Sequence, residues 1–166
     1  MDLGILIARL VIGILMAGHG AQKAFGWFGG YGLEGTGKFM ESLGFRPGRL
    51  FAGAAAWGEV ISGLLIAAGF LGPIGPALML SVMIVAAATV HWKNGLFVTS
   101  NGIEVPLLYA TAAIALALTG FGAYSLDALS GLQSLDSTPL ALGALVLGAA
   151  GGLANLTFRR RTAVAA

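Results

Sequence analysis

The fold is decided by residues 18–30, which read Gly-His-Gly-Ala-Gln-Lys-Ala-Phe-Gly-Trp-Phe-Gly-Gly. Residues 3–17, before this segment, are apolar apart from Arg9, and the chain turns polar after it. Tryptophan and phenylalanine suit the head-group layer of a bilayer, and a lysine beside them can reach lipid phosphates. The segment therefore predicts the point at which a membrane-spanning helix leaves the bilayer.

The composition is that of an integral membrane protein. Of the 166 residues, 57% are hydrophobic and only 10% are charged, whereas about a quarter of the residues in a soluble domain are charged. The formal charge of +2 does not indicate nucleic-acid binding, because most basic residues stand beside apolar segments. The chain has no cysteine, so any thiol or iron–sulfur chemistry would have to belong to a partner.

Hydrophobicity divides the chain into five predicted membrane spans and one surface helix. The spans cover about residues 3–19, 50–71, 74–91, 104–119 and 139–157. After the first span, residues 36–43 predict a short helix lying on the bilayer, with Thr36 as its cap and Gly44 at its end. The predicted fold class is therefore all-α, an integral membrane helical bundle.

Basic residues predict how these spans are oriented. With five spans and the amino terminus outside, eight of the nine basic residues lie on the cytoplasmic side, and the ninth is Arg9 within the first span. The eight are Lys23, Lys38, Arg46, Arg49, Lys93, Arg159, Arg160 and Arg161. Because basic loops stay in the cytoplasm, this distribution favours five spans and a cytoplasmic carboxyl terminus. The alternative has four spans, with residues 139–157 as a surface hairpin or buried stub.

Arg9 and Glu59 are the ionisable residues predicted to lie within spans. An isolated charge at the centre of a bilayer costs at least about 2.5 kcal/mol, so each is expected to have a partner. Counted from the predicted inner ends of their spans, both lie roughly 14 to 15 Å deep. We therefore predict a buried Arg9–Glu59 ion pair. It either locks the helices in register or forms a polar cavity in which Glu59 takes up a proton and Arg9 binds a ligand.

His19 and His91 end the first and third predicted spans on the inner side. Imidazole titrates near neutral pH and can accept a proton, bind a metal or hydrogen-bond to a quinone oxygen. Two histidines without a zinc or di-iron spacing do not make a metal motif, so we assign no metal ligand. Both histidines also suit packing at the interface. Gln22 can extend a polar network from His19, and Lys23 is expected to bind lipid head groups.

These residues resemble the DoxX family of small bacterial membrane proteins. The resemblance is carried by Arg9-Leu10-Val11, residues 18–26, Trp57-Gly58-Glu59, His91-Trp92 and Tyr124-Ser125-Leu126-Asp127. It covers about residues 1–129 and implies a four-helix bundle in the bacterial inner membrane, to which residues 130–166 add the fifth span and a basic cytoplasmic tail. It also implies a redox-associated subunit. One branch of the family is linked with quinone-coupled thiosulfate oxidation, and another with membrane complexes that handle oxidative and thiol stress.

The leading hypothesis is therefore a membrane subunit that supports quinone-linked or thiol-linked redox chemistry. The candidate catalytic residues are Glu59, His19 and His91, and the candidate cofactor-binding residues are Arg9, Gln22 and Trp57. The cofactor that this hypothesis names is a quinone, and the expected partners are membrane lipids, further copies of the chain or redox proteins. A small-solute transporter is one alternative. A non-catalytic scaffold, in which the charges only stabilise the bundle, is the other.

Overall fold

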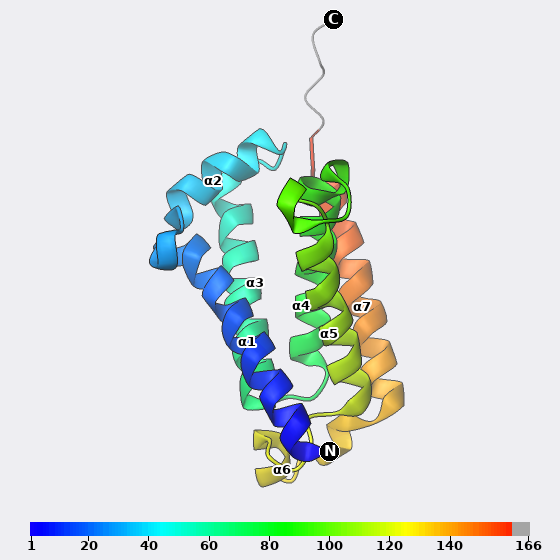
Figure 1. Ribbon diagram of the computed structural model, residues 1–166. Helices are drawn as coiled ribbons and strands as arrows, with labels where there is room; N and C mark the ends of the chain where they lie inside the picture. The colour runs from blue at the N-terminus through cyan, green and yellow to red at the C-terminus, as the bar shows by residue number, and fades with distance from the viewer. Residues whose placement is uncertain (161–166) are drawn as a thin grey trace, which may run out of the picture.

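The structure, a computed structural model, describes residues 1–160, and every regular element in this part of the chain is helical. Arg161, one of the predicted cytoplasmic residues, lies outside the described residues. The long helices are α1 (Asp2–Phe25), α3 (Gly48–Ala68), α4 (Ile74–Ala86), α5 (Glu104–Thr119) and α7 (Thr138–Thr157). They run alternately up and down (Figure 1). The predicted all-α membrane helical bundle is confirmed.

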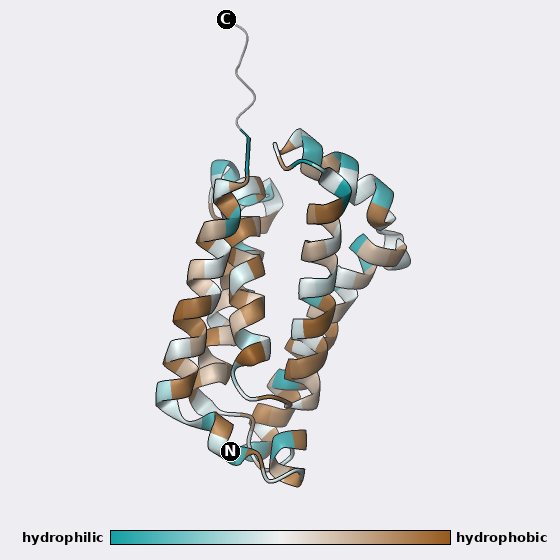
Figure 2. Cartoon of the chain, turned by 180° about the vertical axis from the view of Figure 1, so that it is seen from behind, coloured by the Kyte–Doolittle hydropathy of each residue, from teal (hydrophilic) through white to brown (hydrophobic). Residues whose placement is uncertain are grey.

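Two short helices mark the ends of the bundle. Helix α2 (Gly32–Ser42) lies across one end, and α6 (Leu126–Leu129) lies at the other (Figure 1). We call these the α2 end and the α6 end. Figure 2 shows hydrophobic residues along the long helices and hydrophilic residues mostly at the two ends. This distribution is the one expected of a bundle whose sides face lipid and whose ends face water.

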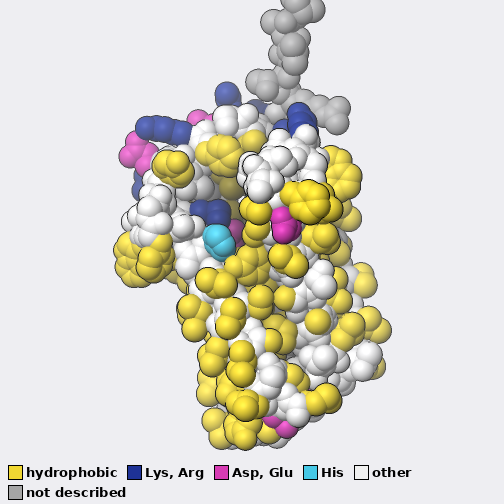
Figure 3. All heavy atoms as spheres, in the orientation of Figure 1, with side chains coloured by type: hydrophobic (Ala, Val, Ile, Leu, Met, Phe, Trp, Pro, Cys, Tyr) yellow, Lys and Arg dark blue, Asp and Glu magenta, His cyan; other side chains and the backbone are white. Residues whose placement is uncertain are grey.

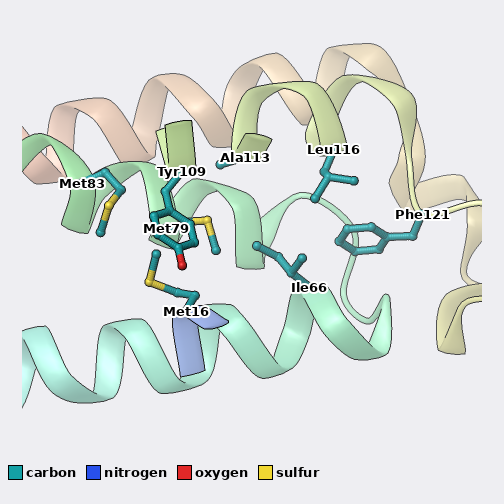
Figure 4. Packing of buried hydrophobic residues seen from close by; sticks show 8 residues of the cluster. All are labelled: Met16, Ile66, Met79, Met83, Tyr109, Ala113, Leu116 and Phe121. Carbon is teal, nitrogen blue, oxygen red and sulfur yellow. The ribbon is translucent and has the colours of Figure 1, made fainter. Parts of the chain in front are cut away.

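The long helices form two groups. Helix α1 packs against α3, and α4 packs against α5 and α7. Between the groups lies the main core, part of which is drawn in Figure 4. Its buried side chains are Met16, Ile66, Met79, Met83, Tyr109, Ala113, Leu116 and Phe121. The core joins the two groups, and three of its residues, Met16, Met83 and Tyr109, also line a cavity described below.

Four helical stretches are long and apolar enough to cross a membrane. They are Asp2–Phe25, Gly48–Ala68, Ile74–Asn94 and Thr138–Thr157. The third consists of α4, a π-helical turn η2 (Ala87–His91) and a 3-10 turn η3 (Trp92–Asn94). Helix α5 is apolar but has only 16 residues, which rise about 24 Å. The chain is thus a multi-pass membrane protein, and α5 as a fifth span stays a prediction.

Helix α1 continues through much of the 18–30 segment instead of ending near residue 19. It ends at Phe25, where Gly26 takes a left-handed φ of 75° and its N–H donates to the carbonyl of Gln22 at 3.2 Å. The 3-10 turn η1 (Trp27–Gly29) follows. The extra turns bring Lys23 into the same helix as His19, four residues apart and therefore on one face.

Helix α2 begins earlier than predicted. It starts at Gly32, so the prediction that Thr36 caps it is wrong, and Thr36 lies buried inside the helix. Glu34 and Lys38, which lie one turn apart, form an exposed ion pair of 2.9 Å. Ion pairs at this spacing stabilise a helix, and this pair includes Glu34, which lies before the predicted start at residue 36.

Glycines fix the register between α1 and α3. A Cβ atom on Gly13 would lie 2.6 Å from the amide nitrogen of Ala67, and one on Gly20 would lie 2.6 Å from the carbonyl oxygen of Ala56. The backbones therefore touch, and neither glycine has room for a side chain. This antiparallel register places Glu59 opposite residue 19 of α1. Counting from the predicted ends of the spans places Glu59 opposite residue 9 instead, which is wrong by about ten residues or roughly 15 Å.

The residues after α7 bridge the two groups at the α2 end. Arg159 Nε donates to the carbonyl of Leu43 at 2.6 Å, and the backbone N–H of Arg160 donates to the carbonyl of Gly44 at 2.9 Å. The ring of Phe158 lies 6.3 Å from that of Phe51. Residues 158–160 thus form a strap that ties α7 to the turn between α2 and α3.

Candidate functional site

A cavity of about 540 Å³ lies between the two helix groups toward the α2 end. Figure 3, drawn in the orientation of Figure 1, shows a hollow in the surface toward the α2 end, with basic side chains and a histidine near its edge. Most of the cavity wall is apolar and includes Met16, Phe39, Met40, Phe45, Phe51, Leu78, Val82, Met83, Val85 and Val105. Its polar lining residues are His19, Lys23, Thr36, Glu59, Ser81, Thr89, His91, Asn101, Tyr109 and Asn155. The cavity suits a molecule with an apolar body and a few polar atoms.

The charged groups of the cavity form an ion pair. Glu59, on α3, is buried, and its Oε2 accepts from Nζ of Lys23 at 2.6 Å. The same ammonium lies 3.4 Å from the carbonyl oxygen of His19, to which it also donates. A lysine ammonium has three N–H donors, so one donor remains for a ligand. The Lys23 side chain is 30% exposed, which keeps that donor accessible from the cavity.

The predicted Arg9–Glu59 pair is wrong. Arg9 is buried toward the α6 end, where its Nη2 donates to the carbonyl of Tyr124 at 2.6 Å and its guanidinium lies 5.6 Å from the ring centre of Phe121. The glycine register sets Glu59 too far along α3 to meet Arg9. Lys23 is the partner of Glu59 instead. It lies beyond the predicted end of the first span, and it reaches Glu59 because α1 extends to Phe25.

His19 and His91 line the cavity from α1 and from the π-helical turn η2. Nδ1 of His91 donates to the backbone carbonyl of Asn101 at 2.9 Å. Nδ1 of His19 donates to Oε1 of Gln22 at 3.2 Å, and Nε2 of that amide donates to the carbonyl of Phe28, also at 3.2 Å. Each neutral imidazole therefore carries its proton on Nδ1 and leaves Nε2 as an acceptor. Both histidines can take a proton through Nε2.

The three predicted cofactor-binding residues lie outside the cavity. Gln22 orients His19 and does not line the cavity itself. Trp57 is 49% exposed and packs edge-to-face on Phe25, with ring centres 5.8 Å apart, on the outer surface. Arg9 lies toward the α6 end, as described above. The structure thus brings together Glu59, His19 and His91, whose catalytic roles stay predictions.

Two cavity residues were not singled out as site residues from the sequence. Lys23 was expected to bind lipid, although its spacing from His19 would have placed both on one face had the helix been extended. Tyr109, on α5, is buried, and its ring packs edge-to-face on His19 at 5.8 Å. Figure 4 shows its hydroxyl directed toward Met16. No local pattern marks Tyr109, because its contact with α1 depends on how distant helices pack.

A second polar cluster lies at the α6 end. The buried carboxylate of Asp127 accepts from the backbone N–H of Leu71 at 3.0 Å and of Gly72 at 2.7 Å. Ser125 caps α6 by accepting from the N–H of Ala128 at 3.1 Å. Arg9, on α1, bonds to the carbonyl of Tyr124, in the segment between α5 and α6. Together these bonds join α1, the α3–α4 turn and the segment at α6. The cluster binds backbone groups and so fastens the bundle.

Within residues 1–160, no group of three or more histidine, aspartate or glutamate side chains is placed to hold a metal ion. The fold defines the class of the protein, a multi-pass membrane helical bundle. The DoxX family model matches residues 4–92, more than half of the chain, and the chain belongs to the DoxX family. The matched part includes all but the first two residues of α1, the whole of α2, α3 and α4, and both histidines. Comparisons with curated proteins and with solved structures gave no match.

Proposed function

We propose that this DoxX-family protein binds a quinone in the cavity at the α2 end and supports redox chemistry carried out with a partner protein. One observation carries the proposal. The Lys23–Glu59 ion pair and both histidines of the chain surround a single apolar-walled cavity of about 540 Å³. Ligand cavities of about 300 to 1,000 Å³ with a few convergent polar groups are typical of small-molecule sites.

The lining residues fit the chemistry of a quinone head group. Such a head group is a flat apolar ring whose two oxygens accept hydrogen bonds when oxidised and donate them when reduced. Lys23 supplies a donor for a carbonyl oxygen, and Nε2 of His19 or His91 supplies an acceptor for a hydroxyl. The apolar wall contacts the ring. When bound, a quinone supplies coupled electron and proton transfer.

The chain itself would hold and move the protons. Nε2 of His19 or His91 takes a proton from a ligand hydroxyl and becomes positively charged. Glu59 lines the same cavity as both histidines. Because the chain has no cysteine, thiol chemistry would belong to the partner.

We also propose that the α2 end faces the cytoplasm of the bacterial inner membrane, with α5 as a fifth span and the amino terminus outside. The described basic residues of the chain other than Arg9 lie in segments at this end, namely Lys23, Lys38, Arg46, Arg49, Lys93, Arg159 and Arg160. Such a bias sets the orientation of membrane proteins. Single cysteines introduced at Lys38 and at Asp2 test it, because only the second should react in intact cells with a membrane-impermeant maleimide.

The quinone site is tested by native mass spectrometry and lipid extraction of protein purified in mild detergent. The comparison includes wild type, Glu59→Gln and His19→Ala. Glu34→Gln is the matched control, because it makes the same change in an exposed ion pair on α2. We expect a quinone to co-purify with wild type and with Glu34→Gln, and to be lost from the two cavity variants.

Other results would favour the alternative functions. If only phospholipid co-purifies, equally from all four proteins, the quinone site is wrong. Substrate-dependent flux in liposomes without a redox partner would then support a transporter. Intact partner complexes with full activity in the Glu59→Gln protein would support a scaffold.

A further inference from the structure

A second hollow, which we call the outer groove, lies on the outside of α1. It also has a volume of about 540 Å³. It follows α1 from Ile14 to Phe25, lies against α3, and is lined at one end by Trp27 and Phe28. In a chain that crosses the membrane, a groove on the outer side of such a helix faces lipid.

His19 connects the outer groove with the cavity, because it lines both. On the cavity side its ring contacts Tyr109, and on the groove side its Nδ1 bonds to Gln22. His19 is the residue that the two linings share, and its neighbour Gly18 adds no side chain on the groove side.

Several residues cover the cavity at the α2 end. The strap of residues 158–160 joins α7 to Leu43 and Gly44 at this end. The side chains of Phe39 and Met40, on α2, also line the cavity. An apolar molecule that enters from the lipid would instead approach through the side of the bundle, where the outer groove lies.

We infer that the cavity takes a lipid-like molecule that has a polar head and one long apolar tail, and that its tail leaves past His19 into the outer groove. The inference rests on the proposed quinone site and names the quinones concerned, those with a long isoprenoid tail. A cavity of about 540 Å³ suits a head group with the start of its tail, and it is too small to enclose a long isoprenoid tail as well. The tail of a bound quinone therefore needs an exit.

The groove determines where the tail lies and adds little to the affinity of the whole quinone. Lipid chains are as apolar as the groove, so the tail gains little free energy on moving from lipid into it. The head group in the cavity supplies the specific contacts. A side chain placed in the groove should therefore weaken tailed ligands by steric exclusion and leave the head group unaffected.

Gly18→Leu tests the inference. A Cβ atom on Gly18 meets nothing within 4 Å, and Gly18 lines the groove but not the cavity. Gly4→Leu is the matched control, since it is the same change on the same helix, also in open space and away from both hollows. Leu64→Trp narrows the groove from α3 and provides a second, independent variant.

The probes are a ubiquinone with a long isoprenoid tail and the same head group without a tail, titrated in one detergent and measured by native mass spectrometry. Wild type and Gly4→Leu should bind both probes. Gly18→Leu and Leu64→Trp should bind the tail-less probe as wild type does and the tailed probe at least about tenfold more weakly, the order of magnitude for forcing atoms into filled space.

The contrary results separate the two proposals. If both groove variants keep the tailed quinone, or lose both probes equally, the inference is overturned and the quinone site remains. If wild type binds neither probe, the proposed function is overturned and the inference with it.

Discussion

The bundle buries charged groups toward both ends, and the two sets of surroundings differ. Toward the α6 end, Nη2 of Arg9 and the carboxylate of Asp127 hydrogen-bond to backbone groups, and neither residue lines the cavity or the outer groove. Nε and Nη1 of Arg9 are buried there without a hydrogen-bond partner among the described residues. At the α2 end, Glu59 pairs with Lys23, and both residues line the cavity. Burial of a charge therefore does not by itself mark a functional site. What its unused donors and acceptors face is more informative.

Together with the proposed function, this difference predicts that the α6 end stabilises the fold and that the α2 end binds the ligand. Substitutions at the first should unfold the bundle and leave the cavity chemistry intact in the folded fraction. Substitutions at the α2 end should leave the bundle folded and weaken ligand binding in the cavity. Four predictions test that division.

The largest effect is expected for Asp127→Ala. It leaves the N–H groups of Leu71 and Gly72 buried without acceptors, and each such group costs about 1 to 3 kcal/mol. We expect a loss of about 3 kcal/mol in the free energy of unfolding, measured by circular dichroism on heating in detergent. Asp127→Asn keeps one acceptor oxygen and should lose about half as much. Wild-type stability in Asp127→Ala would remove the distinction between the ends.

The matching change at the α2 end, Glu59→Gln, should lower quinone retention more than it lowers the free energy of unfolding. Lys23 is partly exposed to the cavity, so leaving it unpaired costs only about 1 kcal/mol. Quinone retention should fall at least about tenfold, the effect of losing roughly 1.4 kcal/mol of binding free energy. Glu34→Gln should change neither quantity measurably. A Glu59→Gln protein as unstable as Asp127→Ala, with its quinone retained, would assign both ends a structural role.

Double-mutant cycles should identify which charges interact. Lys23→Met and Glu59→Gln should show a coupling free energy on the order of 1 kcal/mol, because they remove the same ion pair. Arg9→Met and Glu59→Gln should be additive within about 0.5 kcal/mol, since Arg9 contacts a different region. Chemical unfolding of the single and double variants measures both. Strong coupling of Arg9 with Glu59 would restore the pair predicted from the sequence.

The smallest effect is expected for Trp57→Phe. Trp57 lies outside the cavity and contacts Phe25 edge-to-face, a contact worth about 0.5 kcal/mol beyond its buried area. Quinone retention should equal that of wild type in the co-purification assay. Loss of the quinone would return Trp57 to the binding site.

The sequence was sufficient for the membrane class and for the existence of the long helices, because a long apolar run predicts a helix whatever its neighbours are. It misplaced the end of α1 and the start of α2. It was not sufficient for the pairing of charges. The partner of Glu59 depends on the register between α1 and α3, which is set by close contacts such as that of Gly20 with Ala56. A hydropathy pattern does not contain that register. His19 and Glu59 were recognised as chemically unusual, whereas Tyr109 acquires its position only from the packing of α5.

The spacing of contacts along the chain also bears on how the protein is made. Arg9 and Tyr124 are 115 residues apart, and Leu43 and Arg159 are 116 residues apart. A ribosome adds about 5 to 20 residues each second, so the first member of each pair waits on the order of ten seconds for the second. Lys23 and Glu59 are separated by only 36 residues. During synthesis, the ion pair is therefore available before the wall that encloses it, and α1 with α3 must persist in the membrane until the remaining helices arrive.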